Sequence, residues 1–223
     1  MALAMQKTVR WMAGAAAAAL MIVAAASPAQ AAPTVRALWQ MTEVPTMVDS
    51  AGGDNNGTTS AITMRQGFYD FNGATSIAAV PHNANLNPGT ANIKLETRIL
   101  ADTAPASGDT YDLMRKGVSY TTGGYYKIEL RGKAGGGMTV ACIFKDRNRV
   151  AGYAIGSVPT KAWVTITCTK TATSVTLVAA GTTRTTARVI GNISNTSGVY
   201  LGGKGDGTDV FDGLIDYASI TIG

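Results

Sequence analysis

The chain has 223 residues, with 19 Lys and Arg against 14 Asp and Glu and a formal net charge of +5. The basic residues are spread along the chain without a long Lys or Arg block, so the charge gives no argument for nucleic acid as a partner. One histidine and two cysteines exclude a zinc site built from clusters of these residues.

The first 31 residues have the anatomy of a secretory signal peptide. A basic start is followed by an alanine-rich apolar run over 11–26 and by the small-x-small cleavage sequence Ala-Gln-Ala at 29–31. The apolar run is too short and too rich in alanine for a good membrane span, and no later segment approaches the roughly 18 apolar residues that a span needs. We therefore expect a cleaved signal peptide helix over 1–31, a single domain over 32–223, and a secreted, extracellular protein without a membrane span.

The remaining chain consists of short runs rich in Val, Ile, Thr and Tyr, separated by Gly, Asn, Asp and Pro, and none shows convincing helical periodicity. Apolar and charged residues alternate clearly in 93–99 and again in 125–131, as in half-buried strands. About a dozen strands with frequent turn signals predict an all-β fold built as a two-sheet antiparallel sandwich. The expected strands are 35–40, 67–71, 76–80, 93–99, 110–115, 125–131, 138–146, 149–155, 162–169, 174–180, 183–190, 198–202 and 213–221.

The two cysteines suggest a disulfide, because an exported protein with an even number of cysteines usually pairs them. Alternation points both Cys142 and Cys168 toward apolar surroundings. If the three strands from 138 to 169 formed a plain meander, the cysteines would lie two strands apart, roughly 10 Å and too far to bond. A bridge therefore predicts that the chain changes sheets between them, and two buried free thiols are the alternative.

The last expected strand carries a carboxylate that alternation turns inward. Leu214, Asp216, Ala218 and Ile220 fall on one side of that strand. An acid facing the core needs a metal ion or hydrogen bonds to satisfy it. Calcium is the one cofactor that the residue inventory allows, since it binds oxygen ligands from Asp, Asn and backbone carbonyls. Asp216 is the strongest single candidate ligand, and satisfaction by backbone N–H groups is the alternative.

Groups suited to catalysis are few. The single histidine, His82, lies in a turn, and no Gly-x-Ser-x-Gly sequence supplies a nucleophilic serine. Glycoside hydrolysis usually needs two carboxylates about 5–10 Å apart. Glu96 and Glu129 could in principle approach each other, but Lys or Arg flanks both, so surface ion pairs are the favoured interpretation.

A sugar-binding face needs exposed aromatic surface and oriented polar groups. The outward residues Tyr125, Lys127 and Arg131 of one strand, together with Tyr153, are the candidate ligand-binding residues. Ordinary surface or core-edge positions are the alternative for each of them.

Burial can be predicted for two further pairs of residues from the residues around them. Trp39 and Trp163 each lie in an apolar-rich strand and are expected in the core. Arg115 and Lys116 are expected to be solvated charges beside a turn.

Short motifs follow one another in a fixed order along the domain. They are Leu38-Trp39, Asp49-Ser50-Ala51-Gly52, Phe71-Asn72-Gly73, Leu113-Met114-Arg115-Lys116-Gly117, Trp163-Val164-Thr165-Ile166 and Phe211-Asp212-Gly213-Leu214-Ile215-Asp216. The ordered set resembles the laminin G-like jelly-roll domains of the concanavalin A-like lectin/glucanase superfamily, in the form common in exported bacterial proteins.

The resemblance implies a jelly roll of two packed antiparallel sheets, often with one structural calcium ion. In such domains the acid of the final Ile-Asp strand contributes to the ion site or binds nearby backbone. The resemblance implies this role for Asp216 and, more distantly, for Asp49. The hydrolase branch of the superfamily has a Glu-x-Asp-x-x-Glu strand motif, and that spacing is absent here. We therefore expect no enzymatic activity.

Together these features predict a secreted, non-enzymatic binding module that recognises carbohydrate or another extracellular or cell-surface macromolecule, with calcium as a structural ion. The expected partners are a polysaccharide or an extracellular protein, and not nucleic acid. A glucanase-type glycoside hydrolase and a protein-binding adhesion or structural module are the alternatives.

Overall fold

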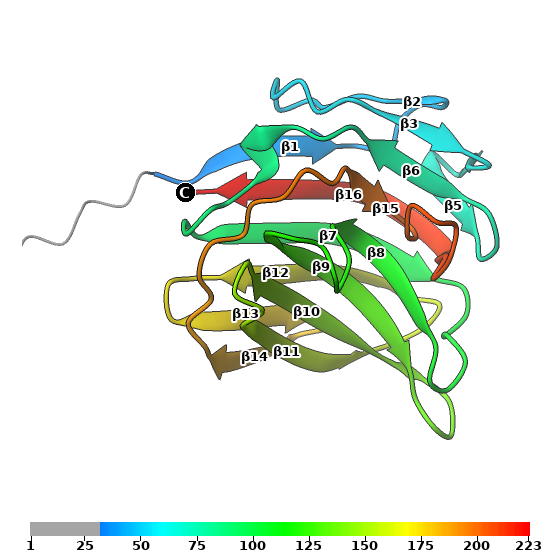
Figure 1. The fold of residues 1–223 in the computed structure, drawn as a ribbon. Helices are drawn as coiled ribbons and strands as arrows, with labels where there is room; N and C mark the ends of the chain where they lie inside the picture. Colours follow the sequence, from blue (N-terminus) through cyan, green and yellow to red (C-terminus); the bar gives the residue numbers. More distant parts are fainter. Residues whose placement is uncertain (1–31) are drawn as a thin grey trace, which may run out of the picture.

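The computed structural model describes residues 32–223, and the predicted signal peptide over 1–31 lies outside the described residues. Two antiparallel sheets pack face to face and contain all the strands of the described residues (Figure 1). The predicted all-β, two-sheet jelly-roll sandwich is confirmed. In the described part of the chain, no helix has the length and apolar character needed to span a membrane.

The strands divide evenly between the two sheets. The first sheet, called the β16 sheet, runs in the order β14 (Thr182–Ala187), β13 (Ser174–Ala179), β12 (Trp163–Lys170), β7 (Ile93–Ala101), β16 (Asp212–Ile222), β5 (Phe68–Asn72), β4 (Thr63–Arg65), with β1 (Thr34–Trp39) also on β16. The second, called the β9 sheet, runs in the order β11 (Ala151–Val158), β10 (Met138–Asp146), β9 (Gly124–Gly132), β8 (Thr110–Lys116), β15 (Val199–Leu201), β6 (Ile77–Val80), β3 (Gly57–Ser60), β2 (Thr46–Met47). A short 3-10 turn, η1 (Ala84–Leu86), precedes β7.

The core fills the space between the sheets with the inward side chains of both. Its largest aromatic members are Trp39, Tyr69, Phe71, Tyr126, Phe144 and Phe211. The prediction for Trp39 is confirmed, and its indole N–H donates to the carbonyl of Asn55 at 2.8 Å. The prediction for Trp163 is wrong. Its neighbour Val164 takes the inward position, so Trp163 lies half-buried on the outer face of the β16 sheet.

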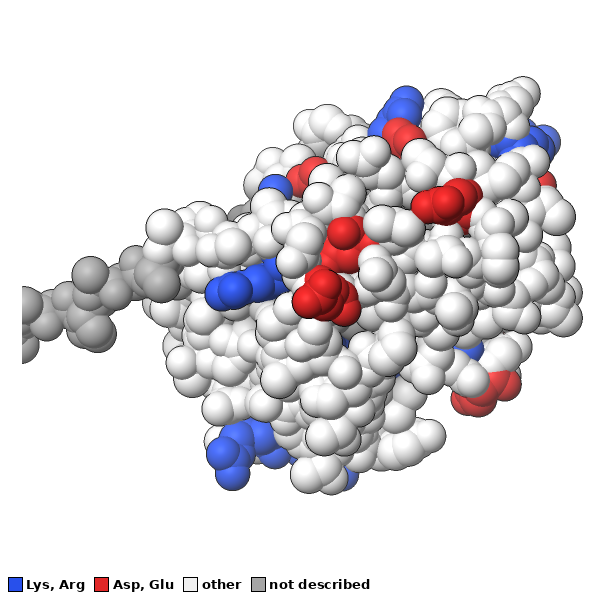
Figure 2. Space-filling model, turned by 90° about the horizontal axis from the view of Figure 1, so that it is seen from above, with Lys and Arg blue, Asp and Glu red and all other residues white. Residues whose placement is uncertain are grey.

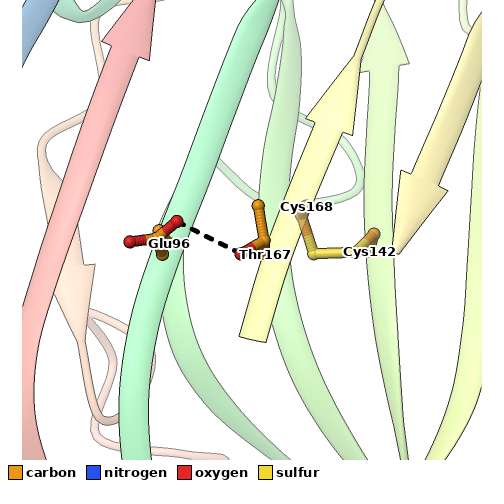
Figure 3. The surroundings of a disulfide bond; sticks show 4 residues. All are labelled: Glu96, Cys142, Thr167 and Cys168. Carbon is orange, nitrogen blue, oxygen red and sulfur yellow. Dashed lines mark hydrogen bonds between the residues drawn. A yellow bond between two sulfur atoms is a disulfide. The ribbon is translucent and has the colours of Figure 1, made fainter. Parts of the chain in front are cut away.

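A disulfide between Cys142 and Cys168 ties the two sheets together, as predicted. Cys142 lies on β10 of the β9 sheet and Cys168 on β12 of the β16 sheet, with 5.4 Å between their Cα atoms (Figure 3). The chain therefore changes sheets after β11, as the geometry of the pair requires. The bond crosses the core and joins strands that share no backbone hydrogen bonds.

A β-bulge in β16 removes Asp216 from the core. The register against β7 shifts between Ile215, which pairs with Ile99, and Tyr217, which pairs with Arg98. Asp216 is the extra residue at this shift, and a bulge of this kind turns a side chain away from the direction that simple alternation gives it.

The bulge also changes which positions of β16 face inward. Ile215 faces inward before the bulge, and Ala218, Ile220 and Ile222 face inward after it. The prediction that Leu214 and Asp216 share the core face with later residues is therefore wrong. The carboxylate of Asp216 points outward and accepts a hydrogen bond from Nη1 of Arg98 at 2.6 Å.

Removing the disulfide should destabilise the protein measurably. The bond closes a loop with a sequence separation of 26 residues, which corresponds to about 3.5 kcal/mol of unfolding free energy in the chain-entropy account. We expect the double variant Cys142→Ala, Cys168→Ala to lose roughly this amount in urea unfolding. Wild-type protein unfolded under reducing conditions is the control, and equal stability of all three samples would contradict an inter-sheet bond.

Candidate binding face

The four predicted ligand-binding residues lie on one surface. Tyr125, Lys127 and Arg131 point outward from β9, because the even-numbered residues between them belong to the core. Ile143 of β10 pairs with Lys127 on one side and with Tyr153 of β11 on the other, so these three form a row across the sheet. We call the outer surface of β8, β9, β10 and β11 the outer β9 face.

Apolar and aromatic groups cover the β11 side of this face. Tyr153 and Ile155 are each 43% exposed. Beneath them, Tyr125 forms a small buried cluster with Ala141 and Ile143, separate from the main core. Burial, followed by the neighbouring Tyr153, raises the pKa of Tyr125 to about 12, so its phenol stays neutral at ordinary pH.

The β8 side of the face rests on a network of buried ion pairs. Asp112, which is fully buried, accepts from Nη1 of Arg115 and from Nζ of Lys127, the latter at 3.3 Å. Lys127 also donates to Glu129, and Nε of Arg131 donates to the other oxygen of Glu129 at 2.5 Å. Burial is the largest influence on Asp112 and raises its pKa, while the two cations oppose that shift. The network fixes the positions of Lys127 and Arg131 from below.

Sequence reasoning missed Asp112 and Arg115 as parts of this network. In a regular strand, residues three apart point to opposite faces. A register shift in β8 between Asp112 and Met114 places both charged side chains on the outer face. The expectation that Arg115 and Lys116 are solvated turn charges is wrong, since both are buried. The signal available in the sequence was the presence of Asp112 and Arg115 three residues apart within one expected strand.

A groove opens where the loops after β8 and β15 meet the outer β9 face. It consists of two adjoining pockets of about 200 and 170 Å³ that share part of their lining. One pocket extends to Tyr125 and Lys127, and the other to Tyr200. The residues common to both are Arg115, Val118, Tyr120, Lys204 and Asp206. Tyr120 is 76% exposed and stands at the rim of the groove.

The two predicted metal ligands have other partners. The carboxylate of Asp49 accepts hydrogen bonds from four backbone N–H groups and one side-chain amide, which belong to Leu38, Ala51, Gly53 and Asn55. Asp216 is paired with Arg98, whose positive charge opposes a cation there. Calcium needs several oxygen ligands with free lone pairs, so neither carboxylate fits it as arranged. Within 32–223 no three His, Cys, Asp or Glu side chains gather at a metal-binding distance, and calcium stays a prediction without assigned ligands.

The carboxylate pair considered for hydrolysis does not form. Glu96 lies on the outer face of the β16 sheet, where it accepts from Oγ1 of Thr167 at 3.2 Å (Figure 3). It also accepts from Nζ of Lys94 at 3.4 Å. Glu129 faces outward from the β9 sheet. The whole core separates them, so they cannot flank one glycosidic bond. Glu96 makes a partly exposed ion pair with Lys94, as the sequence predicts. Glu129 also pairs with its flanking cations, Lys127 and Arg131, but its carboxylate is buried, so the expectation of a surface ion pair is wrong for Glu129.

Charge is sparse on the surface seen from above. Figure 2 shows a few acidic and basic groups lying apart on a largely uncharged surface. Proteins that bind nucleic acid gather Lys and Arg on one face, and this view shows no such patch.

No protein-family model matches the chain, and no curated protein sequence matches it. Its fold is similar to several solved structures. The binding domain of Paraclostridial Mosquitocidal Protein 1 has a TM-score of 0.65 at 18% identity, over 84% of this chain and 48% of that one. Domain 4 of AbnA, a GH43 extracellular arabinanase from Geobacillus stearothermophilus solved in complex with arabinotriose, has a TM-score of 0.61 at 15% identity, over 86% and 93%.

A third similar structure is the binding domain of botulinum neurotoxin DC in complex with rat synaptotagmin II, with a TM-score of 0.61 at 10% identity, over 84% of this chain and 48% of that chain. The chain thus spans about half the length of the toxin binding domains and matches nearly all of the arabinanase domain. At these identities the likeness shows the fold alone, a jelly-roll sandwich.

The ion-pair network should respond unequally to substitution. Asp112→Asn leaves Arg115 as a buried charge without its carboxylate, and we expect a loss of about 3–5 kcal/mol in unfolding free energy. Arg131→Gln removes a more exposed member of the same network and should cost less than about 1 kcal/mol. Urea unfolding of both variants measures the difference. Equal and small losses would show that the network does not bear on stability.

Lys116 gives a pH-dependent prediction. It is fully buried, contacts Nδ1 of His82 at 3.1 Å and donates to the carbonyl of Ser197. Burial lowers its pKa from 10.5 to about 8. Between these values the unfolded chain binds more protons than the folded one, so this group makes stability rise with pH.

We expect wild-type stability, measured relative to Lys116→Met, to rise by about 3 kcal/mol between pH 8 and 10.5. Urea unfolding at several pH values gives the difference, and the comparison cancels the titration of the tyrosines. Parallel pH profiles for the two proteins would mean that Lys116 keeps an ordinary pKa in the fold.

Proposed function

We propose that this protein is a secreted, non-catalytic binding module of the laminin G-like type, and that its outer β9 face recognises carbohydrate. One observation carries the proposal: Tyr153 lies exposed over a face whose polar groups are held in place by buried ion pairs, beside a groove. Sugars are bound by an aromatic surface against the ring and by fixed polar groups around its hydroxyls.

The polar groups of the face suit a hydroxyl-rich ligand. Lys127 and Arg131 are oriented by Glu129, so little side-chain freedom remains to be lost on binding. The groove adds donors and acceptors of both signs, from Lys204 and Asp206, next to the ring of Tyr120. Because charges of both signs are interspersed over the face and the groove, a neutral or weakly charged glycan suits them better than a strongly anionic polymer.

The same geometry supports a non-enzymatic role. Asp112 and Glu129 are cross-strand neighbours, but both lie beneath the surface and are saturated by Arg and Lys. Glycoside hydrolysis requires two carboxylates that reach the scissile bond from the solvent side. Neither of these acids reaches a ligand on the face.

The comparisons support binding without identifying the partner. Among the similar folds, one domain was solved with arabinotriose and another with synaptotagmin II. A polysaccharide is the proposed partner here. An extracellular protein is the second candidate, since Ile155 adds an exposed aliphatic group beside Tyr153 that a protein surface would cover.

A glycan array probed with the purified protein tests the proposal, with and without a chelator to test the calcium prediction. We expect binding to at least one neutral polysaccharide and a loss of about tenfold or more in affinity, roughly 1.4 kcal/mol, for Tyr153→Ala. The matched control is Val178→Ala, since Val178 has the same exposed fraction but lies on the other sheet. Failure to bind any glycan, with specific capture of a protein partner, would favour the adhesion module instead.

A further inference from the structure

A second pocket lies on the opposite side of the sandwich, on the outer face of the β16 sheet. It has a volume of about 450 Å³ and is lined by Leu38, Gln40, Thr42, Gly67, Asp216 and Tyr217. These residues come from the end of β1 and the segment after it, from the turn between β4 and β5, and from the bulge of β16. The core separates this pocket from the outer β9 face, so the two are independent.

The bulge in β16 supplies the carboxylate of this pocket. Without the extra residue, alternation would direct Asp216 into the core, and the bulge turns it outward instead. Its Oδ2 accepts from Arg98, whose guanidinium lies 4.5 Å from the ring centroid of Trp163. Trp163 in turn packs against Phe68 with 4.7 Å between ring centroids. The carboxylate is therefore fixed in position, and its charge is balanced.

Tyr217 is held in the same way. Its hydroxyl donates to Oε1 of Glu96 at 3.0 Å, and the other oxygen of Glu96 accepts from Thr167 and Lys94. The phenol ring consequently has a fixed orientation at the pocket wall. Side chains from β7, β12 and β16 thus combine to position two groups that the pocket exposes.

We propose that this pocket is a second ligand site and that it takes a neutral saccharide unit. The ring of Tyr217 and the side chain of Leu38 offer apolar surface, while Gln40, Thr42 and the carboxylate of Asp216 offer donors and acceptors for hydroxyl groups. The pairing of Asp216 with Arg98 leaves no net charge, which disfavours an anion and a cation alike. With sites on both outer faces, one molecule could join two glycan chains.

Tryptophan fluorescence reports on this pocket separately from the outer β9 face. Trp163 stacks on the arginine that holds Asp216, whereas Trp39 is buried in the core. We would titrate the protein with neutral pentose and hexose oligosaccharides and follow both fluorescence and the calorimetric binding stoichiometry. The expected result is a saturable fluorescence change that persists in Tyr153→Ala and weakens at least tenfold in Gln40→Ala.

Controls separate the outcomes. Trp163→Phe should remove the fluorescence change but leave calorimetric binding, and Thr183→Ala, an exposed position elsewhere on the same sheet, should behave as wild type. If Tyr153→Ala abolishes all binding and the fluorescence of Trp163 does not change on titration of the wild type, the second site is overturned and the outer β9 site stands. Binding that depends on Gln40 and not on Tyr153 would support this pocket and overturn the proposed outer β9 site.

Discussion

The paired charges of Asp112 and Glu129 are the constraint on which the outer β9 face depends. Taking a charge out of water is costly, and only close partners offset that cost. Three cations from β8 and β9 supply these partners, and in doing so they lose their own freedom. An apolar cluster could give similar stability. What the ion pairs add is fixed orientation of Lys127 and Arg131, which a binding surface requires.

Two β-bulges determine both candidate sites. The bulge of β8 brings Asp112 and Arg115 to the same face, and the bulge of β16 brings Asp216 out of the core. In each case one extra residue changes which side chains on one side of the bulge face inward. As a result, a charged side chain lies on the outer face of the sheet and pairs with a residue of a neighbouring strand. The inter-sheet disulfide at Cys142 holds β10, at the centre of the outer β9 face, against the opposite sheet. The sandwich therefore combines a rigid frame with local irregularities at its two outer surfaces.

Features that depend on one strand at a time could be predicted from the sequence. Alternation in β9 correctly placed Tyr125, Lys127 and Arg131 on one face. The inference that a bridge between the cysteines requires a change of sheet was also correct, because a plain meander would hold them too far apart. The orientation of Asp216 and the partnership of Asp112 with Arg115 could not be found in this way, because a bulge is set by the register against a neighbouring strand. Trp163 was misplaced for a related reason, since an apolar-rich strand does not reveal which of its two faces is buried.

The likeness to toxin and arabinanase domains establishes the jelly roll but leaves the ligand to be found by measurement. The most direct test is to map backbone amide chemical shifts of the protein as it is titrated with a glycan that it binds. The largest changes are expected along 125–131 of β9 and at Tyr153 of β11. A bound glycan that leaves these amides unmoved would contradict the assignment of the outer β9 face as a carbohydrate-binding surface.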